Sequence, residues 1–416
     1  MTTEIQTDLI TPLGAYLHLR EEGPAFLLES VERGRLGRHS FVGRGSALLS
    51  FEEAEAALAA SSPVVGYLGY DHVARLEPVP LPGDGPDLPE SRFMAADVLI
   101  RFDHATGVAE VVSGDAASLA ARLARPAPEV PTGGGGPTGL TVRTPEAEAY
   151  RAAVARAKEH IAAGDALQIV LSQRAERATP VTAVDLYRSL RRINPSPYLF
   201  LLELGDLALV GSSPETLVKL EDGRASVNPI AGTVPVGEGD AERLLASEKD
   251  RAEHVMLVDL GRNDLSRVCR PGTVEVRRFL EPERYSHVTH LVSEVTGELE
   301  EGIGPFDLLR ACFPAGTVSG APKVRAMQLI SELEGYRRGP YAGAVGYAVP
   351  GGTLDTCIAI RTIVLSGGVA RMQAGAGVVA DSDPEAEHRE CLAKLEALEA
   401  ALADAEAALG EMEAAP

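Results

Sequence analysis

A run of prolines and glycines divides this 416-residue sequence into two unequal parts. Between Pro126 and Gly139 the chain carries four prolines and five glycines, and such a run sustains neither a helix nor a sheet ladder. We therefore predict an N-terminal domain over residues 1–125, a linker over residues 126–142 and a larger C-terminal domain over residues 143–407. Two or three domains agree with the rough expectation of about 150 residues per domain.

The C-terminal part contains groups of adjacent strands separated by helices, which favours an α+β fold with antiparallel or mixed sheets. We expect Thr144 to cap the first helix, and Thr182 with Asp185 to cap the second. The buried face of the second helix is predicted to carry Leu186, Leu190 and Ile193. Strands are predicted over Leu167–Leu171, Tyr198–Leu204, Leu207–Gly211, Thr216–Leu220, Ala225–Val227, Val274–Phe279, Tyr285–Val295, Tyr341–Ala348, Cys357–Leu365 and Ala370–Val379. Further helices are predicted over Ala241–Asp259, Pro322–Leu333 and Pro384–Ala407.

The charge balance argues against several classes of partner. Lys and Arg total 39 and Asp and Glu total 60, so the formal net charge is −21. This excess of acid disfavours nucleic-acid and anionic-membrane binding. The N-terminus lacks the pattern of a signal peptide, and no apolar run reaches the roughly 18 residues of a membrane helix. The widely spaced cysteines fit reduced thiols, so we expect a cytoplasmic protein.

Two pairs of acidic residues could hold a metal ion. Asp250 and Glu253 lie three residues apart on one predicted helix, and Glu387 and Glu390 lie three apart on another. This spacing places both carboxylates of a pair on one helical face. Two such faces opposed would offer the oxygen ligands that Mg²⁺ prefers. By spacing alone, the alternative of two solvated acidic faces is favoured.

Other residues suggest anion binding and proton transfer. His287 and His290 are predicted to point to opposite faces of a strand, so one of them could act as an acid or base, although a structural role is commoner. Arg361 interrupts an apolar predicted strand and needs an acidic or anionic partner. The glycines of Gly375–Gly377, and the predicted turn Pro229–Thr233, could bring backbone N–H groups close to a carboxylate. Together these features predict a Mg²⁺-dependent site for a small polycarboxylate.

The C-terminal part is similar to the chorismate-binding catalytic domain of the anthranilate synthase component I family, from Thr144 to about Ala400. The segments that carry the resemblance include Gly211-Ser-Ser-Pro-Glu215, Pro229-Ile-Ala-Gly-Thr233, Ala252–Asp264, Arg284-Tyr-Ser-His-Val-Thr-His290, Phe313–Lys323, Tyr341-Ala-Gly-Ala-Val-Gly-Tyr347 and Gln373-Ala-Gly-Ala-Gly377. In the N-terminal part, Leu27–Ser30 and Gly37–Gly43 resemble the family's tryptophan-sensing segment. The resemblance implies a sandwich-like core of mixed or antiparallel sheets, with helices outside and the two parts packed together.

The resemblance also implies an activity. Members of the family are lyases that convert chorismate and ammonia into anthranilate and pyruvate with Mg²⁺, the first step of tryptophan biosynthesis, and L-tryptophan inhibits them. Ammonia comes from a separate glutamine amidotransferase subunit, in an assembly of two large and two small subunits. None of the four cysteines here has the setting of a glutaminase nucleophile.

Roles for particular residues follow from the same resemblance. His290, Glu215 and Thr317 are the implied catalytic residues. The implied chorismate-binding residues are Gly232, Thr233, Tyr341, Arg361, Gly375, Ala376, Gly377 and Lys394. The implied Mg²⁺ ligands are Glu253 and Glu390, helped by Asp250 and Glu387. The implied tryptophan-binding residues are Ser30, Pro197, Tyr198 and Leu199.

Two positions discriminate among related activities. Aminodeoxychorismate synthases carry a nucleophilic Lys where this chain has Ala231, and water-using relatives carry a Lys base where it has Gln168. Ammonia is therefore the expected nucleophile, and a component of aminodeoxychorismate synthase in folate synthesis is the first alternative. A catalytically inactive regulatory protein that binds chorismate or tryptophan is a second alternative. His39 and Leu199 stand where the family more commonly has Tyr and Met. The resemblance therefore implies catalysis but does not fix the strength of inhibition by tryptophan.

Overall fold

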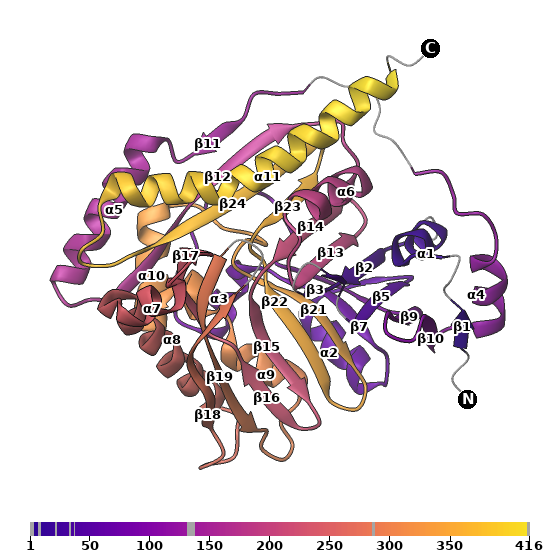
Figure 1. Ribbon diagram of the computed structural model, residues 1–416, viewed down its shortest axis with the longest axis horizontal. Coiled ribbons are helices and arrows are strands. Elements are labelled where there is room, and N and C mark those ends of the chain that lie inside the picture. Colours follow the sequence, from indigo (N-terminus) through magenta and orange to yellow (C-terminus); the bar gives the residue numbers. More distant parts are fainter. Residues whose placement is uncertain are drawn as a thin grey trace.

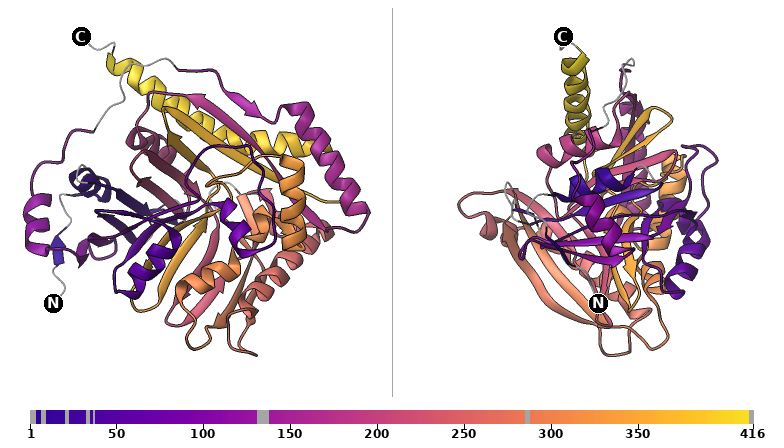
Figure 2. Two further views of the ribbon diagram at one scale, coloured as in Figure 1. Left: turned by 180° about the vertical axis from the view of Figure 1, so that it is seen from behind. Right: turned by 90° about the vertical axis from the view of Figure 1, so that its right-hand side faces the viewer.

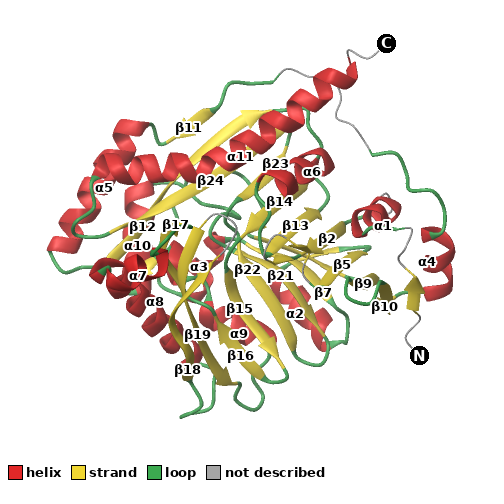
Figure 3. Cartoon of the chain, viewed as in Figure 1, coloured by secondary structure: helices red, strands yellow, loops and turns green. Residues whose placement is uncertain are grey.

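Two large sheets organise the chain in the computed structural model, and helices lie around their outer faces (Figures 1 and 3). The structure describes residues 4–6, 10–20, 23–32, 35–36, 38–130, 138–284 and 288–413. Within these ranges the strands of both sheets pair antiparallel, for example β13 with β14 and β12 with β24. The predicted α+β class with a sheet-based core is confirmed. No helix in these ranges is both long and apolar enough to cross a bilayer.

The first sheet has 12 strands and joins the two parts of the chain. In order across the sheet they are β1 (Glu4–Gln6), β10 (Val108–Ser113), β9 (Val98–Asp103), β5 (His39–Arg44), β2 (Ala25–Glu29), β13 (Tyr198–Glu203), β14 (Leu207–Ser213), β23 (Thr362–Ser366), β24 (Val369–Val378), β12 (Gln168–Ala178) and β11 (Val142–Thr144), with β20 (Gly320–Ala321) on β12. The junction lies between β2 and β13, where Leu199 pairs with Glu29.

The second sheet has 10 strands and also draws on both parts. Its order is β17 (Ile230–Pro235), β19 (Val288–Glu298), β16 (Arg224–Val227), β15 (Thr216–Glu221), β22 (Thr353–Ile358), β21 (Ala344–Val349), β7 (Val64–Leu68), β8 (Ser91–Ala95) and β6 (Leu48–Leu49), with β18 (Glu275–Arg284) on β19. A small separate ribbon pairs β3 (Val31–Glu32) with β4 (Arg35–Leu36). Each sheet contains strands from both sides of the Pro/Gly-rich run, so the two parts of the chain pack together as predicted. The domain boundaries stay a prediction.

The helices cover the sheets. They are α1 (Pro12–Leu19), α2 (Phe51–Ala59), α3 (Val73–Leu76), α4 (Ala116–Leu123), α5 (Ala147–Ala162), α6 (Ala183–Ile193), α7 (Asp240–Ala246), α8 (Glu248–Ser266), α9 (Pro305–Cys312), α10 (Lys323–Glu334) and α11 (Pro384–Glu413), with short 3₁₀ turns η2 (Tyr70–His72) and η3 (Gly316–Val318). The long α11 packs along β24 between α5 and α6, and its C-terminal end extends beyond the rest of the fold (Figure 2).

One apolar core spans the junction of the two parts. It unites Leu27 and Ile100 of the N-terminal strands with Leu186, Leu201 and Leu398 of the C-terminal part, all fully buried. Burying a side chain of this size contributes about 1.5–3 kcal/mol. The first sheet and the helices that cover it are therefore held together by residues that are far apart in sequence.

Several local predictions need correction. Thr144 does not cap α5, because it lies in β11 and Glu146 occupies the N-cap position. The cap of α6 is confirmed, since Thr182 and Asp185 bond reciprocally, but Ile193 at its end is 40% exposed. The helix predicted over Ala241–Asp259 is two helices. Ser247 separates them, because its hydroxyl accepts a hydrogen bond from Asp250 N and starts α8.

Two corrections concern segments near the candidate site. The segment Pro229–Thr233 is not a simple turn, because most of it forms β17 with an irregularity in pairing between Ala231 and Thr233. The predicted strand Cys357–Leu365 is divided between β22 and β23. Arg361 stands in the gap between these strands with a φ of 51°, so it does not lie within a strand.

Candidate active site

The two acidic helices approach each other at one end of β12. Glu253 of α8 accepts a hydrogen bond from Gln168 Nε2 at 3.1 Å, and Gln168 is the first residue of β12. Burial raises the pKa of Glu253, and the nearby carboxylates of Asp250 and Glu390 raise it further. Burial also raises the pKa of Glu387, again with a contribution from Glu390. The acidic residues are therefore not on two separate solvated faces.

These acids suit a divalent cation without forming a closed metal site by themselves. In the described part of the chain, no three His, Cys, Asp or Glu side chains are grouped closely enough to hold an ion. Glu253 and Glu390 nonetheless repel each other in partly desolvated surroundings. The side-chain oxygen Oε1 of Gln168, next to Glu253, is buried and has no hydrogen-bond partner within the described ranges. A cation with oxygen ligands would relieve both unfavourable features.

The glycines of β24 line the same end of β12. A Cβ atom on Gly375 would stand 2.8 Å from both Leu171 O and the Tyr341 hydroxyl, so only glycine fits there. A Cβ atom on Gly377 would stand 2.7 Å from Gln168 Nε2. β23 pairs with β24 only as far as Met372, and the strand edge beyond that point has no strand partner in the described ranges. Backbone groups of this stretch can therefore meet a ligand.

Lys394 connects this strand with the acidic helix. Its Nζ atom donates to Gly375 O at 2.8 Å and lies 2.7 Å from Glu390 Oε1, one turn earlier on α11. Ala376 lies between the two glycines and pairs with Leu171. The structure thus brings Lys394, Glu390 and the Gly375–Gly377 stretch together.

Arg361 provides a positive charge opposite these groups. Burial lowers the pKa of its guanidinium, while Tyr341, Glu390 and Glu215 raise it, in decreasing order. Among the described residues the guanidinium has no hydrogen-bond partner. An arginine held in a left-handed backbone conformation, with acids near it but none bonded to it, is placed to bind an anionic ligand.

Glu215 and Thr317 form an acidic corner of the site. Burial raises the pKa of Glu215 to about 7, against the lowering effects of Thr317, Lys394 and Arg361. Thr317 lies in η3, and its hydroxyl is near enough to lower the pKa of Glu215, although this buried oxygen has no hydrogen-bond partner in the described part of the chain. Near neutral pH, Glu215 can therefore exist as a protonated acid.

His290 lies on β19, opposite Thr233 of β17. Its Nδ1 atom is 3.0 Å from Gly232 O, and burial lowers the pKa of the imidazole. Gly232 has a φ of 69°, and a Cβ atom on it would stand 3.2 Å from Asp250 Cβ. Gly232 therefore lies between His290 and the acidic helix α8. His287 lies outside the described residues.

A second pocket, of about 610 Å³, lies at the junction of the two sheets. The four residues predicted to bind tryptophan all line it: Ser30, Pro197, Tyr198 and Leu199. His39 lines it as well, and the Tyr198 hydroxyl donates to Asp355 Oδ1 at 2.9 Å. The structure thus gathers residues from β2, β5 and β13 around one cavity.

Sequence reasoning missed one residue of the first site. Gln168 was considered only for the amine that it lacks, yet it bonds to Glu253 and touches Gly377. Its polar side chain inside the otherwise apolar predicted strand Leu167–Leu171 was the available signal. The sequence could not show that this side chain meets Glu253, because the two residues are 85 positions apart and only the fold brings them together.

Two acidic helices, a glycine-lined strand edge and a half-buried arginine suit an enzyme that binds a small polycarboxylate together with a divalent cation. The family model described as chorismate binding enzyme matches residues 29–400, and the chain belongs to this family. Anthranilate synthase component 1 of Streptomyces coelicolor is 46% identical, with 97% of this chain and 89% of the relative covered. The protein of the same name from Thermus thermophilus is 43% identical, with 97% of each covered.

A solved structure agrees with these relatives. Anthranilate synthase component I from Streptococcus pneumoniae has a TM-score of 0.77 and 32% identity, with 95% of this chain and 98% of that chain covered. The predicted resemblance, fold class and enzyme class are confirmed.

Proposed function

We propose that this chain is the chorismate-aminating subunit of an anthranilate synthase. It removes the C4 hydroxyl of chorismate as water, adds ammonia at C2 and then eliminates pyruvate to give anthranilate. The observation that carries the proposal is the surroundings of Arg361, whose guanidinium has no hydrogen-bond partner among the residues that the structure describes and whose electrostatic neighbours are Tyr341, Glu390 and Glu215. A dianionic substrate supplies the missing partner.

The substrate's two carboxylates are assigned to opposite sides of the site. Arg361 and Tyr341 bind the enolpyruvyl carboxylate, because the guanidinium offers a fork of donors. The backbone of Gly375, Ala376 and Gly377, with Lys394 beside it, binds the ring carboxylate. Glycine is required on that strand because of the close approach of Tyr341 and Gln168. Gly232 and Thr233, on β17 next to His290 of β19, are assigned to the substrate site as well.

Mg²⁺ is assigned to Glu253 and Glu390, with Asp250 and Glu387 acting directly or through water. When bound, the ion neutralises charge on the ring carboxylate. The mutual repulsion of Glu253 and Glu390 supports this assignment, since a cation removes it.

The proton transfers are assigned to Glu215 and His290. Glu215, with a pKa of about 7, protonates the departing C4 hydroxyl, and Thr317 orients its carboxyl. His290 acts as the acid or base near C2. Because Gly232 O accepts from Nδ1, the neutral imidazole presents Nε2 as its basic nitrogen.

Ammonia is the proposed nucleophile because no amine side chain stands at either discriminating position. Ala231 is buried and apolar, and the side chain of Gln168 donates a hydrogen bond to Glu253. The relatives' name, component 1, supports a partner component 2, which we propose is a glutamine amidotransferase in an assembly of two large and two small subunits. The four buried, unpaired cysteines support a cytoplasmic location.

We further propose that L-tryptophan binds the 610 Å³ pocket and inhibits the enzyme. Ser30 lies at the end of β2, and Tyr198 and Leu199 lie on its partner β13. A ligand there would sit across the junction of the N-terminal and C-terminal strands, so it can alter how they pack.

The experiment that tests the proposed nitrogen source uses the purified chain with chorismate and Mg²⁺. With ammonium salts it should form anthranilate, and at fixed total ammonium the rate should rise with pH up to about 7, as free NH₃ becomes more abundant while Glu215 keeps its proton. Glutamine should not support the reaction without a second subunit. Turnover of glutamine by the pure chain would contradict the assignment of ammonia delivery to a partner.

A further inference from the structure

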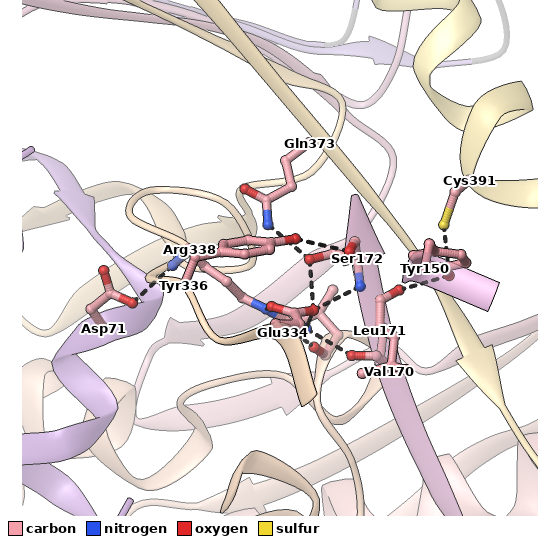
Figure 4. Close-up of polar contacts among 11 residues, drawn as sticks. Asp71, Tyr150, Val170, Leu171, Ser172, Glu334, Tyr336, Arg338, Gln373 and Cys391 are labelled. Atoms are coloured by element: carbon pink, nitrogen blue, oxygen red, sulfur yellow. Dashed lines mark hydrogen bonds and ion pairs between the residues drawn. The ribbon is translucent and has the colours of Figure 1, made fainter. Parts of the chain in front are cut away.

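A fully buried ion pair lies behind the candidate site and takes no part in the chemistry proposed above. Arg338 is 2% exposed, and its side chain contacts Glu334, the last residue of α10, through Nε at 2.9 Å and Nη2 at 2.6 Å (Figure 4). The Glu334 side chain is 3% exposed. Buried ion pairs contribute little net stability, because desolvation offsets their attraction, so this pair calls for another explanation.

The remaining donors of Arg338 reach two separate segments of the candidate site. Nη1 donates to Val318 O at 2.8 Å, directly after Thr317. Nη2 donates to Val170 O at 2.7 Å, and Val170 pairs with Gly377 across the β12–β24 ladder. One planar guanidinium therefore fixes the Thr317 turn relative to the glycine strand.

Glu334 fixes a second point on the same ladder. Its Oε1 atom accepts from both the backbone N and the hydroxyl of Ser172, each at 2.7 Å. Ser172 pairs with Gly375, and it also receives a hydrogen bond from Gln373 Nε2 at 2.8 Å (Figure 4). The ion pair thus contacts the backbone opposite both Gly375 and Gly377.

Arg338 also supports Tyr341. Its guanidinium carbon lies 5.6 Å from the centre of the Tyr341 ring and 4.6 Å from that of Tyr70. Contacts of a cation with ring faces at this range are attractive. Tyr341 in turn limits the space at Gly375 to that of a glycine.

The N-terminal part holds the segment that carries Arg338. Asp71 accepts from Arg338 N at 3.1 Å and from Gly339 N at 3.0 Å, and Tyr70 N donates to Gly339 O at 2.8 Å (Figure 4). These bonds hold the backbone of Arg338 and Gly339 against the N-terminal part.

We propose that Arg338, with Glu334 and Asp71, is a positioning residue for the chorismate site. It sets the Thr317 turn, the Gly375–Gly377 strand and Tyr341 in one arrangement without touching the substrate. The proposal rests on the substrate assignment made above. It predicts that loss of the pair weakens chorismate binding more than it weakens the fold.

The test is chorismate binding to the full chain, measured by calorimetry with Mg²⁺ and without ammonia so that no turnover occurs. The double variant Arg338→Met/Glu334→Gln removes both charges together, which avoids an unpaired buried charge. Its Gln can still accept from Ser172. Its chorismate Kd should rise roughly 10- to 100-fold, the usual effect of losing a group that orients ligand-binding residues.

Kinetics with ammonium separate positioning from mere loss of stability. Misplaced binding groups raise KM for chorismate, whereas a lower fraction of folded enzyme lowers the apparent kcat and leaves KM unchanged. The conservative Arg338→Lys variant keeps the charge but not the fork of donors, so its KM should be intermediate. Asp71→Asn, which keeps one acceptor oxygen, should raise KM in the same direction but less.

The matched control is Arg177→Met/Glu406→Gln, which removes a 2.6 Å ion pair at the far end of β12. It should leave the chorismate Kd and KM unchanged. A folded Arg338→Met/Glu334→Gln protein whose Kd and KM stay within about twofold of wild type would overturn the proposal. Wild-type protein that binds chorismate but forms no anthranilate would refute the proposed function instead, and the Kd comparison would still decide the role of Arg338.

Discussion

The Nδ1 atom of His290 lies 3.0 Å from the carbonyl oxygen of Gly232, which itself has a φ of 69°. A carbonyl can only accept, so in the neutral ring the proton resides on Nδ1. Burial lowers the pKa of the imidazole and keeps it neutral at neutral pH. The irregular backbone at Gly232 therefore orients His290 and selects its tautomer.

Replacement of this imidazole should separate binding from chemistry. His290→Ala should still bind chorismate with Mg²⁺, while kcat falls ~10²–10⁴-fold, the usual contribution of a positioned acid or base. Steady-state kinetics and calorimetry measure the two effects. His104→Ala, which removes an imidazole bonded to Ser40 in the N-terminal part, is the control and should retain full activity. Equal losses in both variants would contradict the role of His290.

The metal assignment predicts a loss of function from the loss of one charge. Glu253→Gln and Glu390→Gln keep the side-chain shape, so each should abolish turnover and weaken Mg²⁺-dependent chorismate binding. Glu385→Gln on α11 breaks an exposed pair with Arg151 and should stay within about ±0.5 kcal/mol of wild-type stability with normal activity. Activity assays across a Mg²⁺ titration measure the loss of turnover. Near-normal activity in both site variants would contradict the metal assignment and show that these acids only form solvated helix faces.

The raised pKa of Glu215 predicts a pH dependence with a definite sign. The protonated form is the proposed acid, and it is lost as the pH rises through about 7. Once rates are corrected for the concentration of free NH₃, kcat/KM should therefore fall above neutral pH. Glu215→Gln should be nearly inactive, whereas Glu300→Gln, at an exposed position, should keep the wild-type profile. A corrected kcat/KM that stays level across neutral pH would exclude Glu215 as the acid.

The second pocket predicts feedback control. L-Tryptophan should inhibit the wild-type chain, and Ser30→Leu should weaken inhibition because the larger side chain occupies the pocket. Turnover without tryptophan should change little, since Ser30 directly follows β2, and three strands separate β2 from β24 in the first sheet. Ser118→Leu, exposed on α4, is the control. If wild-type enzyme ignores tryptophan, the assignment of this pocket fails, with His39 and Leu199 as the first residues to examine.

Much of the fold could be predicted because local patterns were strong. The capping box of Thr182 and Asp185 marked α6, and the strands predicted on either side of Gly205, which has a φ of 79°, pair as the β13–β14 hairpin. Arg361 was correctly singled out as a charge among apolar residues. Its position between β22 and β23 could not be predicted. There its backbone adopts a left-handed conformation that tertiary contacts impose and no local sequence pattern reveals.

The residues of the candidate site were named one by one from the sequence, but the contacts between them could not be predicted. Resemblance named Lys394 and Gly375, while only the structure joins them through a 2.8 Å hydrogen bond. The contacts of Asp71 with the Arg338 segment link positions 267 residues apart. Pairing at such separations depends on how the two sheets cross, and hydrophobic periodicity carries no information about it.

The identity of the aromatic product tests the proposed reaction most directly. Chorismate, Mg²⁺ and ammonium are incubated with the purified chain, and the products are separated by chromatography and identified by fluorescence and mass. We expect anthranilate and pyruvate in equal amounts, with none formed when Mg²⁺ is chelated. Accumulation of an aminated chorismate that keeps its enolpyruvyl group, or of a hydroxylated isomer without nitrogen, would contradict the assignment of this chain as an anthranilate-forming enzyme.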